Sequence, residues 1–160
     1  MALAVNRVRA TGWRRLRVLR LAALAESPEM FGSGLARERA FDEKEWRGRA
    51  GRPATFIASL NSVDVGIASV YEFDGAWCVM GMWVAPEARG TGVVDALIHA
   101  CESSVESAGA AEIALWVMED NPRGIRAYGR LGFSHTDTRQ HVRDGRCEML
   151  MVKALRRTGN

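Results

Sequence analysis

Apolar and polar positions along the first third of the chain predict a short strand followed by helices. Leucines recur at helical spacing over Gly12 to Glu26, where Thr11 can cap the helix and Ser27-Pro28 can end it. Ala4 to Ala10 is a short strand candidate before this helix. After a glycine-broken loop, the stretch Met30 to Arg49 predicts a second helix, or two short ones, ending before the next glycine.

The middle of the chain is rich in β-branched and aromatic residues, which predicts three antiparallel strands. The runs Thr55 to Leu60 and Val63 to Phe73 are separated by Asn61-Ser62, a turn signal typical of a hairpin. Asp74-Gly75 is a second turn signal, so Trp77 to Val84 should return as the third strand.

The next segment predicts a crossover from one strand to another. Apolar residues at helical spacing follow the glycines near position 90, and Gly109 closes this helix. Glu112 to Met118 is then a buried strand. Because a helix precedes it, we expect this strand to lie parallel to Trp77–Val84.

The last part of the chain predicts a helix and a closing hairpin. Asn121-Pro122 supplies an N-cap and a first-turn proline, and Gly132 ends the helix. Ser134 to Val142 and Arg146 to Lys153 form a strand pair joined at Asp144-Gly145. The predicted order is therefore a strand, two helices, three antiparallel strands, a helix, a strand, a helix and a hairpin.

Length and composition restrict the class of protein. The 160 residues suit one domain, 1–160, and 48% of them are apolar. No apolar run approaches the roughly 18 to 20 residues of a membrane span, so we expect no membrane partner. Met1 to Ala10 lacks the apolar core and cleavage site of a secretory signal, which favours a cytoplasmic protein.

The three cysteines, Cys78, Cys101 and Cys147, are scattered and lie in apolar surroundings. An odd and scattered set favours reduced core residues over a disulfide framework or a metal site. We therefore expect no metal.

The net charge of +3 is unevenly distributed. A basic cluster near the N-terminus suits a nucleic acid or a phosphate-bearing cofactor, whereas a solvated helix face is the simpler alternative. No aromatic stacking pattern accompanies the cluster, so we expect no nucleic-acid partner. Residues 26–45 carry six acidic and three basic residues, a local charge of −3 that suits either a cationic substrate or a solvated face. The basic cluster consists of Arg7, Arg9, Arg14, Arg15, Arg17 and Arg20.

Two motifs carry chemistry. Gly90, Thr91 and Gly92 fall where a loop enters a helix, so their backbone N–H groups can point outward at the positive end of the helix dipole. That geometry binds an anion, most often a phosphate. The second motif is the stretch from Asn121 to Tyr128, Asn-Pro-Arg-Gly-Ile-Arg-Ala-Tyr, followed by a Leu-Gly-Phe sequence.

With these two motifs, nearly the whole chain resembles the GNAT superfamily of acyl-CoA-dependent N-acetyltransferases. The glycine loop is similar to the coenzyme-binding segment of that family, and the second motif is similar to its Asn-x-Arg-Ala-Ile-x-x-Tyr…Leu-Gly-Phe signature. Leu21 to Arg39 also looks like the N-terminal helices of many bacterial members. The resemblance implies an α/β (α+β) fold in one domain, with a mixed, mostly antiparallel sheet of six to seven strands. It further implies a splayed pair between strands 4 and 5 and about four flanking helices.

The resemblance also implies roles for individual residues. The backbone of Met82 is expected to bind the oxyanion, Val84 to pair with the pantetheine arm, and Tyr128 to act as general acid toward the departing thiolate. Asn121 and Tyr128 lie two helical turns apart, so both can face the coenzyme arm. The expected coenzyme-binding residues are Met82, Trp83, Val84, Arg89, Gly90, Thr91, Gly92, Val93, Val94, Asn121, Arg123 and Tyr128.

A general base is missing from the expected place. Many relatives carry a glutamate on the fourth strand, but Trp77 to Val84 contains no acid or histidine. An amine with a pKa of about 10.4 is neutral in roughly one molecule in 2,500 at pH 7, so a proton acceptor is needed. Glu72 and Glu119, near strand ends, are the leading candidates, and surface carboxylates are the alternative. The histidines His99, His135 and His141 are weaker candidates.

The resulting hypothesis is an acetyl-CoA-dependent N-acetyltransferase that acts by direct transfer in a ternary complex. The expected acceptor is a primary amine of a small molecule, with Met30 to Ala40 and the closing hairpin as pocket walls. Two alternatives stay open: a non-catalytic acyl-CoA-binding module, and an acetyltransferase for protein or peptide amines. The exposed closing strands are compatible with a homodimer by analogy.

Overall fold

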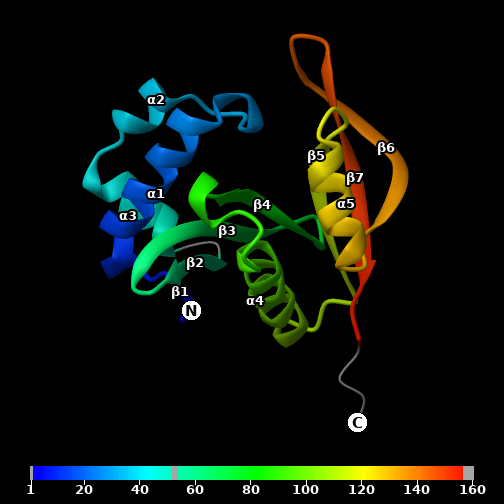
Figure 1. The fold of residues 1–160 in the computed structure, drawn as a ribbon, viewed down its shortest axis with the longest axis horizontal. Helices are drawn as coiled ribbons and strands as arrows, with labels where there is room; N and C mark the ends of the chain where they lie inside the picture. Colours follow the sequence, from blue (N-terminus) through cyan, green and yellow to red (C-terminus); the bar gives the residue numbers. More distant parts are fainter. Residues whose placement is uncertain (1, 52–53, 157–160) are drawn as a thin grey trace. The chain divides into compact units, whose positions relative to one another are not determined.

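The strands assemble into a seven-stranded sheet in the order β1-β2-β3-β4-β5-β7-β6 (Figure 1). The computed structural model describes residues 2–51 and 54–156. The strands are β1 (Leu3–Arg7), β2 (Ala54–Leu60), β3 (Val63–Phe73), β4 (Ala76–Val84), β5 (Glu112–Met118), β6 (Ser134–Arg143) and β7 (Arg146–Ala154). The α-helices of the described residues are α1 (Trp13–Glu26), α2 (Leu35–Arg39), α3 (Glu43–Gly51), α4 (Val93–Ser107) and α5 (Pro122–Arg130).

The sheet is mixed, as the sequence predicts. β1 pairs with β2 and β2 with β3 in antiparallel register, and β7 is antiparallel to both β5 and β6. β4 and β5 are parallel and pair through Cys78 with Ala114 and Val79 with Leu115. The crossover through α4 therefore gives the predicted parallel pair, and the expected fold class is confirmed.

The chain folds into two compact units. The first unit comprises Met1–Val70 and Gly81–Cys101, and the second comprises Tyr71–Met80 and Glu102–Asn160. The proposal of one domain over 1–160 stays a prediction, and Met1, Arg52, Pro53 and residues 157–160 of that range lie outside the described residues.

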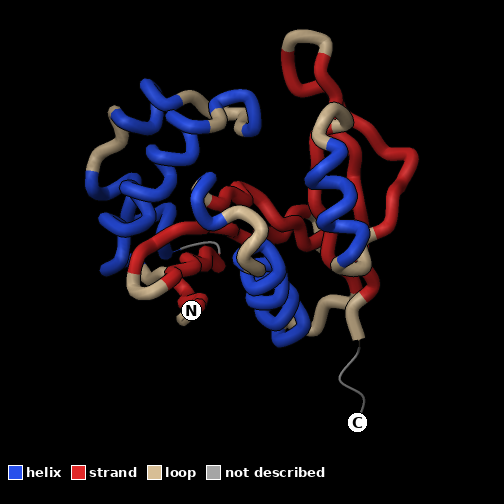
Figure 2. Tube along the Cα trace, viewed as in Figure 1, coloured by secondary structure: helices blue, strands red, loops and turns tan. Residues whose placement is uncertain are grey.

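In the first unit, α1 contacts both α2 and α3, and Figures 1 and 2 show these three helices gathered together. α4 approaches β3 closely at Gly66, where an added Cβ would lie 2.8 Å from a methyl group of Val93 and 3.1 Å from one of Leu97. A larger residue at this position would push the helix away from the strand. Gly66 therefore sets the distance between β3 and the start of α4.

A buried ion pair joins the three N-terminal helices. Glu38 of α2 is 1% exposed and accepts hydrogen bonds from Nε and Nη2 of Arg20 at 2.9 and 3.0 Å. Arg49 of α3 contributes Nη1 at 2.9 Å from the same carboxylate, and the Arg20 guanidinium lies 4.6 Å from the ring centroid of Phe31. Burial alone raises the pKa of Glu38, but hydrogen bonding and attraction by the two arginines outweigh it and lower this pKa.

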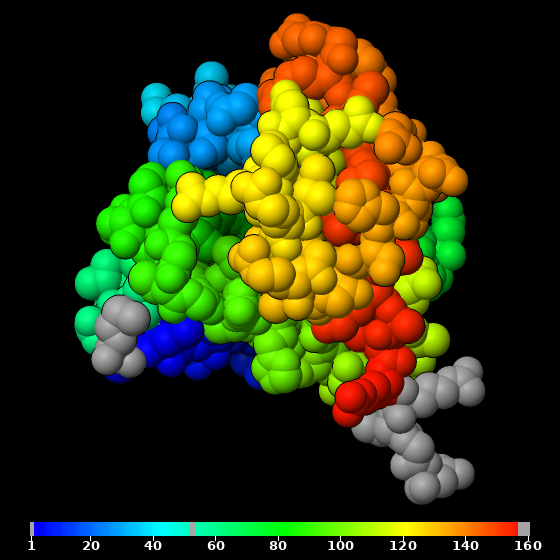
Figure 3. Space-filling model, turned by 45° about the vertical axis from the view of Figure 1, so that its right-hand side comes forward, coloured from blue at the N-terminus to red at the C-terminus, as the bar shows by residue number. Residues whose placement is uncertain are grey.

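In the second unit, β5, β7 and β6 lie side by side with α5 (Figure 1). Most side chains of β6 are exposed, and Figure 3 shows this orange segment spread over the surface. A hollow of about 470 Å³ lies where residues 74–77 meet residues 108–112. None of the sequence-predicted site residues lines it.

Several predicted boundaries and caps are wrong. The first strand is Leu3–Arg7 rather than Ala4–Ala10, because the chain turns at Ala10–Gly12 into a 3₁₀ turn. That turn moves the N-cap of α1 to Gly12, so Thr11 does not cap the helix.

The segment after α1 forms two short helices, the second of the two alternatives that the sequence left open. The chain breaks at Asp42, whose carboxylate accepts from the Glu45 N–H while the Glu45 carboxylate accepts from the Asp42 N–H, both at 2.8 Å. This is a reciprocal capping box, and it starts α3. α3 runs through Gly51 instead of ending before it, and the described residues contain five α-helices where about four were expected.

The described residues include no helix that is both long and apolar enough to cross a membrane. Cys78 and Cys101 are buried, as expected of core residues, whereas Cys147 is only half-buried. Burial raises the pKa of the Cys78 thiol to about 11.

Candidate functional site

The glycine loop before α4 contains two residues in the left-handed backbone region. Gly90 and Gly92 have φ angles of +79° and +87°, which residues with a side chain rarely adopt. A Cβ added at either glycine would meet no atom within 4 Å, so the positive φ, and not crowding, requires glycine. Figure 2 shows the loop in tan between the short turn Pro86–Ala88 (η3) and α4.

The first turn of α4 follows this loop directly. The helix begins at Val93, and the Ala96 N–H donates to the Gly92 carbonyl at 3.1 Å. The N–H groups before Ala96 in the helix precede the first such bond, as in any α-helix. Together with the dipole of this 15-residue helix, they favour a negatively charged ligand.

Two side chains of the loop bind within the protein. The Thr91 hydroxyl donates to the Ala88 carbonyl, a contact that closes the loop, and coenzyme binding by Thr91 stays a prediction. Arg89 donates through Nε to the Val84 carbonyl at 3.0 Å and through Nη2 to Glu26 at 2.9 Å. Its side chain is still 39% exposed.

Along the end of β4, successive residues direct their backbone N–H and C=O groups alternately toward β3 and away from it. The Ala85 N–H donates to the Val65 carbonyl of β3 at 2.8 Å. Because backbone direction alternates along a strand, Val84 and Met82 point their N–H and C=O groups away from β3. These are the two residues expected to bind the oxyanion and the pantetheine arm, although the Val84 carbonyl already accepts from Arg89. Their roles stay predictions.

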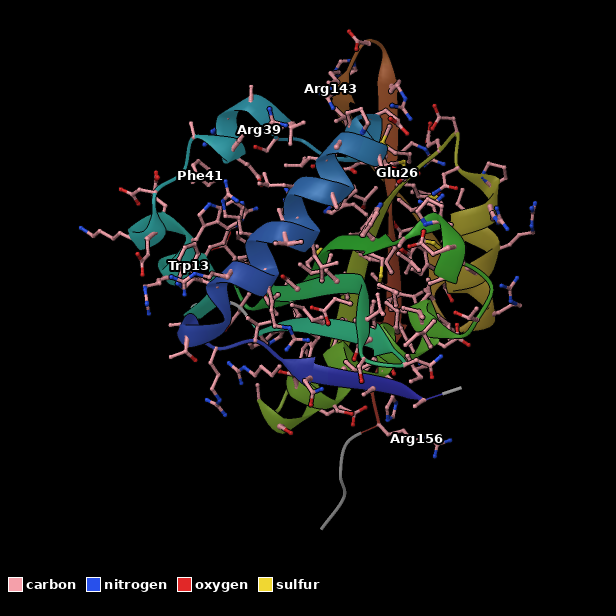
Figure 4. The ribbon with its side chains drawn as sticks, turned by 60° about the vertical axis from the view of Figure 1, so that its left-hand side comes forward. Trp13, Glu26, Arg39, Phe41, Arg143 and Arg156 are labelled. Atoms are coloured by element: carbon pink, nitrogen blue, oxygen red, sulfur yellow. The ribbon has the colours of Figure 1, made fainter. Side chains whose placement is uncertain are left out.

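Glu26 is a residue that the sequence reasoning missed. It ends α1 (Figure 4), and its Oε2 accepts hydrogen bonds from Ser27, from the Trp83 indole at 2.9 Å and from Arg89. Hydrogen bonds from these donors hold the pKa of Glu26 below its usual value, and the bond from Ser27 has the largest effect. The partners Trp83 and Arg89 lie 57 and 63 residues away along the chain, so no local pattern could reveal these contacts.

α5 begins as the sequence predicts. The Asn121 side chain accepts from the Gly124 N–H at 3.0 Å, and Pro122 is the first helical residue. Tyr128 is half-buried, and its ring contacts Phe133 edge-on at 6.1 Å between centroids. Arg123 is exposed on the first turn. The N-cap is confirmed, whereas coenzyme contact by these residues stays a prediction.

The cap predicts a measurable loss of stability in Asn121→Ala. Alanine leaves the Gly124 N–H without its partner, so the free energy of unfolding should fall by about 1 kcal/mol in urea denaturation. Asn121→Asp keeps an acceptor oxygen and should retain most of the stability. An Asp variant as unstable as the Ala variant would mean that the capping bond is not the source of the loss.

The two candidate bases differ in their surroundings. Glu119 follows β5 and accepts a hydrogen bond from Arg139 of β6, with 40% of its side chain exposed. Glu72 lies exposed on β3, and His99 is exposed on α4. Among residues 2–51 and 54–156, no three His, Cys, Asp or Glu side chains gather closely enough to hold a metal ion.

Several charged residues of the acidic segment 26–45 and of the basic N-terminal cluster form ion pairs within the protein. In the acidic segment, Glu26, Glu38 and Glu43 all bind arginines. In the basic cluster, Arg20 pairs with Glu38, and Arg15 pairs with Asp64 of β3 at 2.7 Å. These pairs weaken the argument from local charge for a cationic substrate at residues 26–45.

Comparisons with known proteins agree on one family. A model of the acetyltransferase (GNAT) family matches residues 17–133. Among solved structures, a GNAT-family acetyltransferase from Streptococcus pneumoniae has a TM-score of 0.81 at 13% identity, covering 96% of this chain and 99% of that one. The ribosomal-protein-S18-alanine N-acetyltransferase from Escherichia coli has a TM-score of 0.70 at 19% identity, and the match covers 99% of this chain and 97% of that one. The paiA N-acetyltransferase from Thermoplasma acidophilum, in complex with coenzyme A, has a TM-score of 0.72 at 14% identity. The match covers 96% of this chain and 99% of that one.

Proposed function

Because the chain belongs to the acetyltransferase (GNAT) family, we propose that it transfers the acetyl group of acetyl-CoA to a primary amine of a small molecule. The transfer is direct and takes place in a ternary complex. The amine nitrogen attacks the thioester carbonyl, the C–S bond breaks, and the sulfur leaves as a thiolate that takes up a proton. The attacking nitrogen loses one proton, so the products are an amide and free coenzyme A.

The observation that carries this proposal is the loop at the start of α4. Two glycines with positive φ, the backbone N–H groups of the first helical turn and the guanidinium of Arg89 suit the diphosphate of a coenzyme. A solved structural neighbour, the paiA N-acetyltransferase, is in complex with coenzyme A, which supports the same ligand class.

Tyr128 is the proposed general acid. A thiol has a pKa of about 8.5 and a phenol about 10, so complete proton transfer to a free thiolate is uphill by about 2 kcal/mol. Tyr128 therefore acts by hydrogen bonding as the thiolate develops, with proton transfer late in the step. Glu72 and Glu119 remain the proposed acceptors of the amine proton, directly or through a water molecule.

The acceptor is proposed to be a small amine, and the compartment the cytoplasm. The proposed acceptor walls, Met30 to Ala40 and the closing hairpin, carry no sequence signature of a peptide groove, which favours a small molecule. Cys78 and Cys101 are buried and form no disulfide with another described residue, which is compatible with a reducing compartment.

A screen of amines tests the function. Antibiotics, polyamines, amino acids and peptides are incubated with acetyl-CoA and the protein, and release of free thiol is recorded. We expect amine-dependent release with at least one small amine. Release with peptides alone would replace the small-molecule acceptor by a protein amine. Binding of acetyl-CoA without release on a broad panel would favour a non-catalytic coenzyme-binding module.

A further inference from the structure

Glu26 connects three elements of the first unit through one oxygen atom. Its Oε2 accepts from Ser27 at the end of α1, from the Trp83 indole of β4 and from Arg89 of the loop before α4. Ser27 and Trp83 are only 7% and 8% exposed, so two of the three donors belong to well-packed side chains. The carboxylate is therefore held by the packed part of the protein and accepts from Arg89 in a fixed position.

Arg89 is fixed at two points of its guanidinium group. Nε donates to the Val84 carbonyl, and Nη2 donates to Glu26. A guanidinium is planar and carries five N–H donors in a rigid fork, so two such bonds set the orientation of the whole group. Three donors remain to bind a ligand, and the side chain is 39% exposed.

We propose that Glu26 is a positioning residue that holds the Arg89 guanidinium ready to bind the diphosphate of coenzyme A. This inference rests on the proposed function. It adds that a carboxylate on α1, far from the loop in sequence, sets the affinity of the loop for the phosphates. Its role is to place a cation, and it does not itself touch the reacting atoms.

Two effects of Glu26 on phosphate binding oppose each other. Its negative charge partly neutralises Arg89, which weakens attraction of an anion. Its hydrogen bond orders a long and flexible side chain before the ligand arrives, which strengthens binding. Because the side chains of Glu26 and Arg89 are 33% and 39% exposed, solvent screens the charge effect, and the ordering effect is expected to dominate.

The test is a binding experiment with three ligands and a matched control. Wild type and Glu26→Ala are titrated with coenzyme A, with dephospho-coenzyme A, which keeps the diphosphate, and with pantetheine, which lacks it. For the two diphosphate ligands we expect Kd to rise about 3- to 10-fold in Glu26→Ala, the loss expected when one long side chain must be ordered on binding. Kd for pantetheine should be unchanged.

Three further variants make the expectation specific. Glu87→Ala removes a negative charge from η3 beside the loop, and Kd for coenzyme A should stay at or slightly below the wild-type value. Glu26→Gln keeps an acceptor oxygen and should show a smaller rise than Glu26→Ala. In an Arg89→Ala background, Glu26→Ala should cause no additional loss of coenzyme A affinity. Thermal unfolding of each variant shows that the fold is retained.

Other results would overturn the inference. Equal weakening for all three ligands, or an additive loss in the Arg89→Ala background, would indicate a general structural effect. Unchanged affinity for coenzyme A with a raised KM for the amine would make Glu26 an acceptor-binding residue. Failure of the wild-type protein to bind coenzyme A would overturn the proposed function together with this inference, whereas equal binding by wild type and Glu26→Ala would overturn this inference alone.

Discussion

Replacement of Glu38 by glutamine is expected to lower the free energy of unfolding by about 3 to 5 kcal/mol. The carboxylate is 1% exposed and is shared by Arg20 and Arg49. Glutamine has nearly the same shape but no charge, so it leaves the guanidinium of Arg20 buried without a counter-ion. Since small domains have a total stability of about 5 to 15 kcal/mol, this loss is a large share of it. Urea denaturation of the two proteins at pH 7 measures the difference.

The stabilisation contributed by Glu38 should depend on pH. The folded-state pKa of Glu38 is lowered by its arginines. The stabilisation is therefore complete above the unfolded-state pKa of about 4.3 and is lost as the pH falls from there through the folded-state pKa. The stability difference between wild type and Glu38→Gln should accordingly shrink as the pH falls below about 4.3, because the unfolded chain takes up a proton at Glu38 before the folded protein does.

Glu43→Gln provides the control for the Glu38 prediction. Its pair with Arg47 spans one helical turn of α3, and both side chains are about half exposed, at 53% and 45%. An exposed pair of this kind contributes about 0.3 to 0.5 kcal/mol. Equal small losses in the two variants would contradict the account of Glu38 as a buried junction of three helices.

Replacement of Tyr128 by phenylalanine is expected to lower the rate of acetyl transfer about 10-fold or more, with little change in the Kd for coenzyme A. Removal of the hydroxyl takes away the proposed proton donor, and general acids contribute about 10²- to 10⁴-fold where proton transfer is complete. The ring and its edge-on contact with Phe133 are retained, so the fold should not change. Single-turnover kinetics isolate the chemical step from product release.

Tyr71→Phe is the matched control for Tyr128→Phe, because Tyr71 and Tyr128 are the two tyrosines of the chain. Tyr71 lies on β3 and stacks on Phe73 at 6.0 Å between centroids. Loss of its hydroxyl should leave the single-turnover rate within about twofold of wild type. An unchanged rate in Tyr128→Phe would remove Tyr128 from the acid role.

Local sequence signals account for much of the fold. The N-cap and first-turn proline at the start of α5, the glycine loop before α4 and the turns at Asp74-Gly75 and Asp144-Gly145 all appear where the sequence predicts them. Each of these depends on residues within one or two turns of the chain, where steric preference and capping decide the conformation. The parallel β4–β5 pair followed from the crossover rule.

Two different reasons explain why some structural features were not predicted from the sequence. The break between α2 and α3 had a local signal, the Asp42-x-x-Glu45 capping box, which could have separated the two helices. The contacts of Glu26 with Trp83 and Arg89, and of Arg20 with Glu38, depend on packing between distant segments. An acidic residue in a helix has no pattern that distinguishes a solvated carboxylate from one that binds an arginine across the fold.

The most direct test of the central claim follows a labelled acetyl group from acetyl-CoA to the amine found by the screen. We expect thiol release and acetylated amine to appear in equal amounts and both to depend on the amine. We expect no label on the protein when the amine is absent. Thiol release without an acetylated amine, or label carried covalently by the protein, would contradict direct N-acetyl transfer.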